Sequence, residues 1–366
     1  MSMDIYDMKL IITGGGTGGH IYPGVAVARE LAARGDEHHV LWVGARRGLE
    51  SSIVPKEGIP FLPLKVTSLK GMGFFYRIGS LVNLAKAFTQ SVGIISREKP
   101  DAVLGVGGYA SGPMGLAAIF MRRPLALAEQ NASPGFTNRW LAKGASMVFT
   151  SWPGSEVHFP EGKTVMAGNP VRNEFVRANH VKADSRFVAL VIGGSQGAAP
   201  LNKAMVDAAE NLAPLAERIR IIHQTGERDL KMVNEAVAKS DLDWETAAYF
   251  SDVAQRIAGA DLVISRAGAG AVSEICVVGR AAVYIPFPQA ADDHQTKNAL
   301  PAVREQAAIM INQSELTGEK LAEIIIGLEG DRERTKAMGD RARALGRPRA
   351  AQMIVDKILA MVKEAA

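Results

Sequence analysis

The stretch "KLIITGGGTGGH" (residues 9–20) decides the fold class of this chain of 366 residues. A β-branched apolar run, typical of a buried strand, leads directly into five glycines within six residues. Because glycine has no Cβ, the backbone N–H groups of such a loop, and the N-terminus of a following helix, can approach an anion closely. A bare turn needs one or two glycines, so we expect this loop to face a ligand.

The spacing of Gly14, Gly16 and Gly19 matches the G-x-G-x-x-G pattern of dinucleotide-binding folds. Pro23 and Gly24 mark the expected start of the next helix. Alone, this match is weak evidence for any particular ligand.

A dinucleotide site also needs an acid at the end of the second strand, where it holds the ribose. The stretch "HVLWVGARRG" (39–48) offers Arg46 and Arg47 there instead. Arginines could meet the 2′-phosphate of NADP, so an NADP-dependent oxidoreductase is a hypothesis, although a disfavoured one.

Composition indicates a soluble chain long enough for two domains, with 47% hydrophobic and 22% charged residues. No run approaches the roughly 20 apolar residues of a membrane span. The single cysteine, Cys276, closes no intrachain disulfide and is expected to be a small buried hydrophobe. The first ten residues contain acids and no apolar core, unlike a signal peptide. These features predict a cytosolic protein.

Short apolar runs alternate with longer amphipathic stretches, which predicts parallel sheets covered by helices. Helical patterns run through residues 24–34, 201–217 and 315–328. The expected strands are residues 9–13, 39–43, 101–106, 187–192, 261–265 and 282–285.

Glycine-rich turns recur at matching places in two units. The first unit contains "GGGTGG" (14–19) and "GGYASGP" (107–113), and the second contains "GGSQGA" (193–198) and "RAGAGAVSE" (266–274). Ligands of open parallel sheets bind at the carboxyl ends of the strands, where such turns lie. Two facing units would therefore form a cleft between them.

The boundary between the units is expected near "GNPVRNEF" (168–175), because Pro170 and the charged run after it break the pattern. We expect a first domain of residues 1–167 and a second of residues 168–346. A C-terminal helix of about residues 347–366 is expected to pack back on the first domain.

The turn "GGSQGA" has the features of a phosphate-binding loop. Its glycines leave the backbone open, Ser195 adds a hydroxyl donor, and the helix expected at about 200–213 points its positive end at the loop. The pattern G-x-x-x-x-G-K-[ST] is absent, which argues against ATP hydrolysis of the P-loop type.

Two further polar stretches each have two interpretations. Glu274 either accepts both hydroxyls of a ribose or is a first-turn glutamate that complements its helix dipole. The run Asp292, Asp293, His294 and Gln295 is either an N-cap cluster or a group of side chains that grips a sugar. The residues alone leave both alternatives open.

Six motifs occur in one order: "GGGTGGH", "GGYASGP", "EQN" followed by "GFTNRWLA", "GNPVR", "GGSQGA" and "DDHQTKNA". Together they resemble the MurG family of peptidoglycan glycosyltransferases, from about residue 9 to the last helix. The resemblance implies an α/β chain of the GT-B fold, with two Rossmann-like parallel-sheet domains facing across a cleft.

The resemblance also implies an inverting hexosyltransferase. Such an enzyme moves N-acetylglucosamine from UDP-N-acetylglucosamine to the muramyl sugar of lipid I, which carries undecaprenyl diphosphate, and so forms lipid II for peptidoglycan synthesis. Another GT-B enzyme that uses UDP-N-acetylglucosamine, either a lipid glycosyltransferase or an epimerase, is the closest alternative. A non-enzymatic nucleotide-sugar sensor is a third.

Site residues of the first unit follow from the matching motifs. The resemblance implies that Thr17, Gly18 and Gly19 lie against the donor sugar. It implies that Asn131 of "EQN" contacts the N-acetylglucosamine and that Tyr109 faces the acceptor.

The matching motifs also imply which residues bind the rest of the donor. The resemblance assigns Arg172 and Ser195 to the diphosphate, Glu274 to the ribose and Gln295 to the sugar hydroxyls. The contact with uracil falls near Ser251.

The chain departs from the family pattern at four positions. Ala128 stands where "HEQN" usually has histidine, and Gln289 replaces a common histidine. Gly270 and Ala271 replace a bulkier pair before "VSE". These changes concern contacts with the base and the ribose.

The reaction needs donors at the diphosphate, because negative charge grows on the departing UDP in an oxocarbenium-like transition state. Arg172, Ser195 and a helix N-terminus would supply them, so no metal or other cofactor is expected. The one D-x-D sequence, "DLD" (241–243), is expected in a surface loop and is disfavoured as a metal site.

The attacking hydroxyl also needs a base. His20 suits this role, because the unperturbed pKa of histidine is about 6.5. The alternative is an orienting or capping histidine beside the glycine loop, and Glu129 and Tyr109 are the next candidates for the base.

A basic, acid-free segment indicates contact with a membrane surface. Residues 1–166 carry 17 Lys and Arg against 12 Asp and Glu, and residues 58–97 contain no acid. Phe74 and Phe75, near Lys70, are expected to anchor the chain to anionic lipid. The helix that follows has no interleaved aromatics for base stacking, so no nucleic acid is expected. The protein is expected at the cytoplasmic face of the inner membrane, as a peripheral protein.

Overall fold

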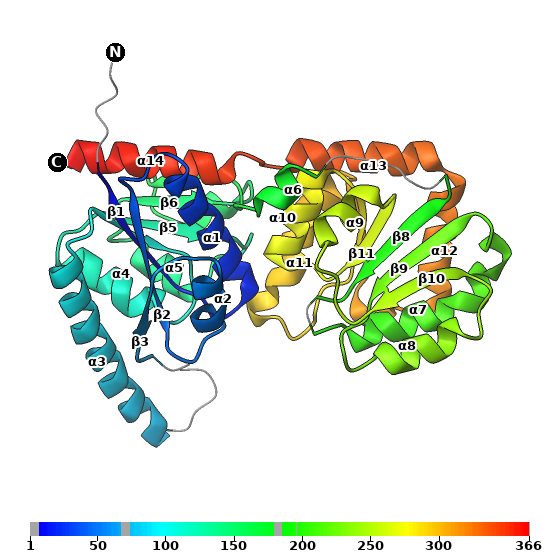
Figure 1. Cartoon of the computed structure of the whole chain (residues 1–366), viewed down its shortest axis with the longest axis horizontal. Coiled ribbons are helices and arrows are strands. Elements are labelled where there is room, and N and C mark those ends of the chain that lie inside the picture. The colour runs from blue at the N-terminus through cyan, green and yellow to red at the C-terminus, as the bar shows by residue number, and fades with distance from the viewer. Residues whose placement is uncertain (1–6, 67–73, 179–184, 195, 366) are drawn as a thin grey trace, which may run out of the picture. The chain divides into compact units, whose positions relative to one another are not determined.

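A computed structural model describes residues 7–66, 74–178, 185–194 and 196–365, apart from the side chains of residues 74–82. The chain divides into two compact units (Figure 1). The first unit comprises residues 1–172 and 348–366, and the second comprises residues 173–347. Each unit is built on one parallel sheet with helices packed against it, which confirms the expected α/β class with two Rossmann-like sheets.

The first unit contains a seven-stranded sheet in the order β3-β2-β1-β4-β5-β6-β7. All neighbouring strands run parallel. The order reverses between β1 and β4, which is the switch point where such folds bind ligands. The strands are β1 (Lys9–Thr13), β2 (His39–Ala45), β3 (Phe61–Leu64), β4 (Ala102–Gly105), β5 (Leu125–Glu129), β6 (Met147–Thr150) and β7 (Thr164–Met166).

Apolar residues of the first unit form two clusters of buried side chains. The helix α14 belongs to one of them, because Ile354, Val355 and Ile358 are buried with Val25 of α1. An ion pair of 2.8 Å joins Arg34 to Asp356. The helices are α1 (Gly18–Ala32), α2 (Glu50–Lys56), α3 (Phe74–Glu98), α4 (Ser111–Phe120), α5 (Phe136–Leu141), the short 3-10 helix η1 (Ser155–His158) and α14 (Ala350–Ala365).

The expected helix start at Pro23 and Gly24 is wrong. The helix α1 begins at Gly18, with Thr17 in an extended conformation as its N-cap, so Pro23 lies inside it. Gly24 is required by packing, since a Cβ there would lie 2.5 Å from the ring of Trp42. From local preference, Pro and Gly predict a helix boundary. Here they lie inside the helix, because α1 packs closely against β2.

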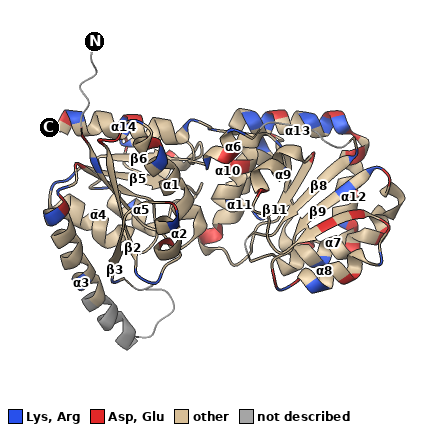
Figure 2. Cartoon of the chain, viewed as in Figure 1, with Lys and Arg blue, Asp and Glu red and all other residues tan. Residues whose placement is uncertain are grey.

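Charge is unevenly distributed over the first unit. The segments of α4 and α5 contain no acidic residue, and none occurs between Asp101 and Glu129 or between Glu129 and Glu156. In Figure 2 the ribbon of α4 has no red segment, in contrast to the densely charged α13 (Arg332–Leu345) of the second unit.

The second unit contains a six-stranded parallel sheet in the order β10-β9-β8-β11-β12-β13. Its order reverses between β8 and β11, so both glycine-rich turns of this unit flank the switch point. The strands are β8 (Phe187–Ile192), β9 (Ile219–Gln224), β10 (Asp243–Ala247), β11 (Leu262–Ser265), β12 (Ala281–Tyr284) and β13 (Ala308–Met310).

Helices of the second unit pack against its sheet and bury a cluster of apolar side chains that includes Phe187, Leu201 and Ile325. Cys276 of α10 is also buried, and burial raises the pKa of its thiol to about 12, which confirms the expected hydrophobe. The remaining helices are α6 (Asn173–Val176), α7 (Ala199–Leu212), η2 (Ala213–Leu215), α8 (Leu230–Val237), α9 (Val253–Gly259), α10 (Ala269–Val278), η3 (Ala291–Asp293), α11 (His294–Arg304), η4 (Gln313–Glu315) and α12 (Gly318–Gly330).

All six expected strands are present; β1 and β8 have the expected ends, and the ends of β2, β4, β11 and β12 differ by one or two residues. The helical patterns are also present but shifted. The pattern at 201–217 corresponds to α7, which ends at Leu212, and the pattern at 315–328 corresponds to α12, which begins at Gly318. Of the sequence "DLD", Asp243 lies in β10 and not in a loop.

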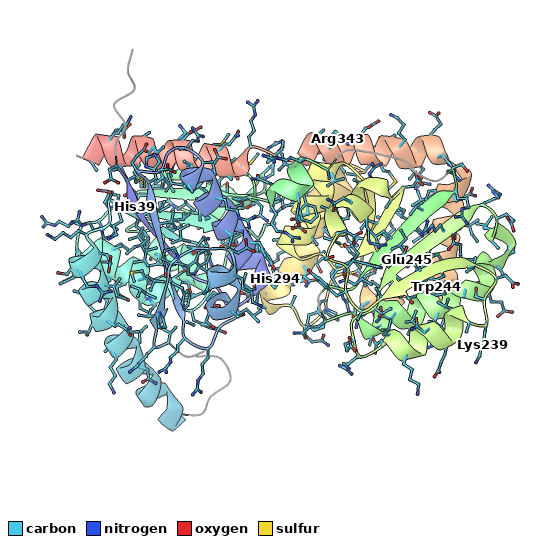
Figure 3. All side chains as sticks on the ribbon, viewed as in Figure 1. His39, Lys239, Trp244, Glu245, His294 and Arg343 are labelled. Atoms are coloured by element: carbon cyan, nitrogen blue, oxygen red, sulfur yellow. The ribbon has the colours of Figure 1, made fainter. Side chains whose placement is uncertain are left out.

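A buried histidine ties α7 to the strands of the second unit. His223 donates from Nε2 to Oδ1 of Asn202 (2.9 Å) and stacks on Trp244, which Figure 3 labels. Asn202 in turn donates to the carbonyl of Thr225 and to Asp229, both at 2.8 Å. Among the described residues Nδ1 of His223 has no hydrogen-bond partner, and burial lowers the pKa of this histidine to about 4.

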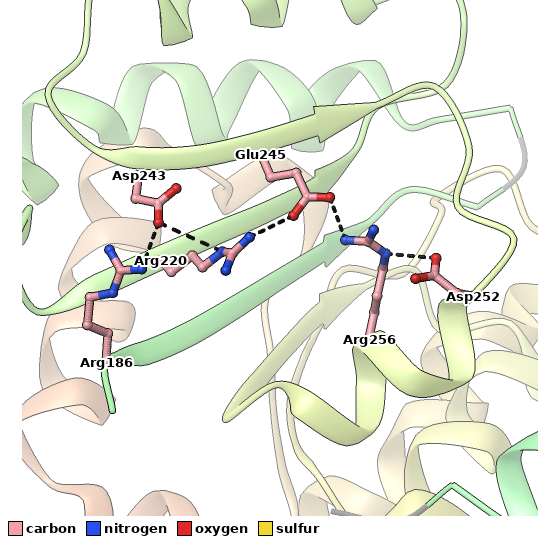
Figure 4. A network of polar contacts seen from close by, with 6 residues as sticks. All are labelled: Arg186, Arg220, Asp243, Glu245, Asp252 and Arg256. Carbon is pink, nitrogen blue, oxygen red and sulfur yellow. Dashed lines mark hydrogen bonds and ion pairs between the residues drawn. The ribbon is translucent and has the colours of Figure 1, made fainter. Parts of the chain in front are cut away.

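A row of alternating charges crosses one face of the same sheet (Figure 4). Arg220 lies in the middle, 3.0 Å from Glu245 and 3.8 Å from Asp243. Arg256 of α9 bonds Glu245 and Asp252, and its guanidinium lies 3.7 Å from the ring centroid of Phe250. The row therefore fixes the segment around Phe250 against β10.

The buried His223 predicts a loss of stability in mild acid. The pKa is about 6.5 in the unfolded chain and about 4 in the folded protein, so between these values the unfolded state binds the extra proton. Above pH 6.5 the stabilisation that comes from keeping His223 neutral is fully present. As pH drops from 6.5 to 4, this histidine lowers the free energy of unfolding by up to ~1.4 kcal/mol per pH unit.

The measurement is urea unfolding from pH 7.5 to 4.5. His223→Gln, which keeps a donor for Asn202 but does not titrate, should show a shallower pH dependence than the parent chain. His158→Ala, which removes an exposed histidine, is the matched control and should keep the parent slope. Equal slopes for the parent and His223→Gln would contradict the prediction.

Candidate active site

Two glycine-rich turns of the first unit interlock at its switch point. The N–H of Gly15 donates to the carbonyl of Gly107 (3.0 Å). A Cβ on Gly14 would lie 2.1 Å from the same carbonyl oxygen, and a Cβ on Gly108 would lie 2.3 Å from the carbonyl oxygen of Gly15. Ser111 donates its hydroxyl to the carbonyl of Thr13 at 2.8 Å. The two turns therefore form one continuous surface of backbone at the ends of β1 and β4.

His20 lies on this surface in the first turn of α1. Its Nδ1 is 3.2 Å from the hydroxyl of Thr17. A Cβ on Gly107 would lie 2.8 Å from Cδ2 and 3.1 Å from Nε2 of the ring. The ring is thus held by Thr17 through one nitrogen, while the other nitrogen faces the second turn.

Glu50 holds the first glycine-rich turn in place through hydrogen bonds, a role that the sequence did not predict. Its carboxylate is 1% exposed and accepts the N–H of Gly16 at 2.8 Å and the N–H of Ala45 at 2.9 Å. A Cβ on Gly15 would lie 2.3 Å from its carboxyl carbon. The acid expected after the second strand of a dinucleotide site therefore exists in this chain, but it binds the glycine loop itself.

Glu129 and Asn131 form a second buried support at the end of β5. The carboxylate of Glu129 accepts the backbone N–H and the side-chain amide of Asn131, at 3.0 and 3.1 Å. It also accepts the N–H of Gly135 and the amide of Asn138, at 3.1 and 2.9 Å. Four donors surround this carboxylate, which is 3% exposed, and they leave little room for a substrate hydroxyl, so the geometry disfavours Glu129 as a base.

Tyr109 lies at the carboxyl edge of the sheet, and Arg172 packs on α1. Tyr109 belongs to the turn after β4 and is 47% exposed. The guanidinium of Arg172 lies 4.9 Å from the ring centroid of Tyr22 in α1. The first unit therefore brings six expected site residues to the carboxyl edge of its sheet or to the start of α1: Thr17, Gly18, Gly19, His20, Tyr109 and Asn131. Arg172 packs on α1.

In the second unit, the turn after β8 packs tightly on the turn after β9. The N–H of Gly197 donates to the carbonyl of Gly194 (3.1 Å), and both glycines have positive φ. A Cβ on Gly197 would lie 2.0 Å from the carbonyl oxygen of Thr225. Ser195, the expected phosphate ligand, lies outside the described residues.

Gln224 joins this turn to the segment near the expected uracil contact. Its side chain is 3% exposed, donates to the carbonyl of Gly194 at 3.0 Å and accepts the N–H of Phe250 at 3.0 Å. Phe250 precedes Ser251 in the chain. The sequence "HQTGER" (223–228) carries no glycine pattern, which is why sequence reasoning did not identify this residue.

Gln295 connects two other loops of the second unit. Its Oε1 accepts the N–H of Ala267 (3.2 Å) and the N–H of Phe287 (3.0 Å). Asp293, two residues earlier, is the N-cap of α11 and accepts the hydroxyl of Thr296 at 2.6 Å. Asp293 therefore occupies the N-cap position, but its carboxylate accepts the Thr296 hydroxyl and makes no capping bond to the described N–H groups of α11. Gln295 lies at the carboxyl edge of the sheet.

Glu274 lies in the second turn of α10. The helix begins at Ala269, with Gly268 as its N-cap, and has no acid in its first turn. The alternative of a first-turn glutamate is therefore wrong, because the helix starts one turn earlier than that alternative requires.

Comparison with known proteins assigns both units to one family. The description "Glycosyltransferase family 28 N-terminal domain" matches residues 10–150, and "Glycosyltransferase family 28 C-terminal domain" matches residues 188–354.

Two relatives have the same name, UDP-N-acetylglucosamine--N-acetylmuramyl-(pentapeptide) pyrophosphoryl-undecaprenol N-acetylglucosamine transferase. The protein of Myxococcus xanthus is 45% identical over 95% of this chain and 92% of its own length. The protein of Geobacter sulfurreducens is 41% identical over 98% of this chain and its full length.

Solved structures agree with this assignment. MurG of Acinetobacter baumannii superposes with a TM-score of 0.82, at 31% identity, over 96% of this chain and 99% of that one. A UDP-GlcNAc 2-epimerase from Neisseria meningitidis superposes with a TM-score of 0.69 at 13% identity, over 96% of this chain and all of that one, and shows a shared fold alone. The chain belongs to the MurG family of glycosyltransferases, within glycosyltransferase family 28.

Proposed function

We propose that this enzyme transfers N-acetylglucosamine from UDP-N-acetylglucosamine to the muramyl sugar of an undecaprenyl-diphosphate-linked acceptor, with inversion. The observation that carries the proposal is the match over nearly the full length to named N-acetylglucosaminyltransferases. The first unit would bind the acceptor, and the second would bind the UDP sugar.

The chemistry is a single displacement at C1 of N-acetylglucosamine. The bond from C1 to the UDP oxygen breaks as the muramyl hydroxyl oxygen bonds to C1 from the opposite face, and the hydroxyl proton goes to a base. His20 fits this role because the Thr17 hydroxyl can accept a hydrogen bond from Nδ1–H, and in that tautomer Nε2, beside Gly107, carries the lone pair.

The donor would be held by groups at the carboxyl edges of the sheets. Arg172 and Ser195 would bind the diphosphate, and Glu274 would accept the ribose hydroxyls. Asn131 and Gln295 would contact the sugar, beside the backbone of Thr17, Gly18 and Gly19. Tyr109 would face the acceptor. Nucleotide-sugar epimerases share the fold, but they need no acceptor hydroxyl, so dependence of UDP release on the acceptor separates the two activities.

We further propose that the first unit binds the surface of an anionic membrane at the cytoplasmic side. None of the helices in the described ranges is long and apolar enough to cross a bilayer. Phe120 and Phe136 are 69% and 73% exposed, and Trp140 is half-exposed. The surrounding stretch is free of acids and carries exposed cations, among them Lys86, Arg122, Arg139 and Lys143 (Figure 2). Exposed aromatics beside cations favour anionic lipid. The expected anchors Phe74, Phe75 and Lys70 lie outside the described side chains.

The catalytic proposal predicts that UDP release requires both UDP-N-acetylglucosamine and a lipid I analogue. His20→Ala should lower kcat by ~10²-fold or more, the loss expected of a missing general base, with nearly unchanged affinity for UDP. The measurements are UDP release and calorimetric binding of UDP. His158→Ala is the matched control and should retain full turnover. Turnover near that of the parent chain in His20→Ala would remove His20 from the role of base.

The membrane proposal predicts salt-sensitive binding to vesicles that contain anionic phospholipid. Phe120→Ser with Phe136→Ser should weaken binding several-fold, because each exposed ring buries apolar surface in the interface. Val157→Ser, at another exposed apolar position of the first unit, is the control and should bind like the parent. Co-sedimentation at low and high salt measures both effects. Vesicle binding that is unchanged by salt and by replacement of the two phenylalanines would refute the proposal.

A further inference from the structure

An apolar cavity of about 370 Å3 opens beside the second glycine turn of the first unit. Tyr109, Gly112 and Pro113 of that turn line it, together with Leu116 of α4 and Phe136 and Trp140 of α5. Among the described residues that line it, none is charged. Its volume falls in the range of small-molecule sites, roughly 300–1,000 Å3.

The side chains at its mouth are unusually exposed for their size. Tyr109 is 47%, Trp140 50% and Phe136 73% exposed. Single exposed apolar residues are common, but several large ones around a cavity mark a binding surface.

The order of features along the first unit matches the order of groups in the proposed acceptor. His20 lies on Gly107, the N-terminus of α4 follows, and the cavity begins at Tyr109 and Gly112. In the acceptor, the muramyl sugar is bonded to a diphosphate, and the diphosphate is bonded to an isoprenoid chain. A sugar hydroxyl near His20 places the diphosphate near the helix N-terminus, which suits an anion, and the first isoprene units at the cavity.

We propose that this cavity is a subsite for the isoprenoid carbons next to the diphosphate of the acceptor. The inference rests on the proposed function and goes beyond membrane binding. The proposed membrane contact uses Phe120, Phe136 and Trp140 on the surface of the unit, whereas the cavity between α4 and α5 would bind one chain of the substrate itself.

The test uses two water-soluble lipid I analogues that differ in the group on the diphosphate, a two-isoprene chain or a methyl group. Turnover is measured without detergent or vesicles, so no membrane contributes. The parent chain should have a KM at least about tenfold lower for the isoprenoid analogue, since each buried methylene contributes about 0.8 kcal/mol. Trp140→Ala, which removes a half-exposed wall, and Leu116→Trp, which fills the cavity, should bring the two KM values together.

Val157→Ser is the matched control, because it removes an exposed apolar side chain of the first unit outside the cavity and should leave the KM ratio unchanged. Equal KM values for both analogues in the parent chain would overturn the subsite. The subsite would also be overturned if Trp140→Ala and Leu116→Trp both kept the parent ratio of the two KM values, because the preference for the isoprenoid analogue would then come from another surface. No turnover with either analogue would instead contradict the proposed function.

A second inference concerns the donor and rests on different contacts. Gln224 is the described side chain that bonds both the turn after β8 and the segment at Phe250. The Phe250 segment is held on its other side by Arg256 and the charge row of Figure 4. We infer that Gln224 is a positioning residue, which sets the spacing between the diphosphate and the base of a bound UDP sugar.

Gln224→Leu should raise the KM for UDP-N-acetylglucosamine about tenfold or more, with kcat within about twofold, because the buried N–H of Phe250 and the carbonyl of Gly194 both lose their partner. Gln224→Glu keeps an acceptor for Phe250 but loses the donor to Gly194, so it should show a smaller rise and should fold if the leucine variant does not.

Thr335→Val is the matched control for the loss of a buried hydrogen bond in the same unit. Its hydroxyl donates to the carbonyl of Leu328 at 2.8 Å, so the variant should lose stability without a change in KM. An unchanged donor KM in both Gln224 variants, or a KM rise equal to that of Thr335→Val, would reduce Gln224 to a structural residue.

Discussion

The candidate site of the first unit depends on direct contact between two stretches of backbone. Gly14 and Gly15 meet Gly107 and Gly108 so closely that a Cβ on Gly14 or Gly108 would lie 2.1 or 2.3 Å from a carbonyl oxygen of the other turn. A Cβ on Gly15 would lie 2.3 Å from the carboxyl carbon of Glu50. All four glycines also have positive φ, which L-amino acids with side chains rarely adopt. Any other residue would force β1 and β4 apart at their carboxyl ends. The position of His20 depends on this contact, because the ring lies on Gly107.

The glycines of this chain fall into two groups with different causes. One group is required by neighbouring protein atoms, as Gly14, Gly15 and Gly197 are. For the other group, which includes Gly16, Gly194 and Gly270, a Cβ would meet no described atom within 4 Å. Packing explains the first group without any ligand. In the second group, Gly16 and Gly194 have positive φ, so their backbone conformation explains the missing side chain.

Much of the fold was predictable because its causes are local. Strand runs such as residues 187–192 and the glycine turns that follow them are set by neighbours in sequence, and the repeat of those turns indicated two sheets with matching switch points. The start of α1 was not predictable, because Pro23 and Gly24 are accommodated by Trp42 from another strand. The supports were also missed. Glu50 and Gln224 act through bonds that span 34 and 26 residues, and no short pattern reports such a distance. The family motifs identified the surface residues of the site, but the buried side chains that hold those residues became visible only in three dimensions.

The helix α14 has a consequence for synthesis of the chain. Its side chains Ile354, Val355 and Ile358 complete the apolar cluster that contains Val25, yet they follow the entire second unit in sequence. During translation, the first 172 residues emerge with one face of α1 uncovered, and that face stays uncovered until residues 173–347 have been made. The second unit, which is continuous in sequence, has no such delay. The unit that is made first is therefore the one that finishes folding last, and a ribosome-bound intermediate would expose apolar surface to chaperones for the time needed to translate the second unit.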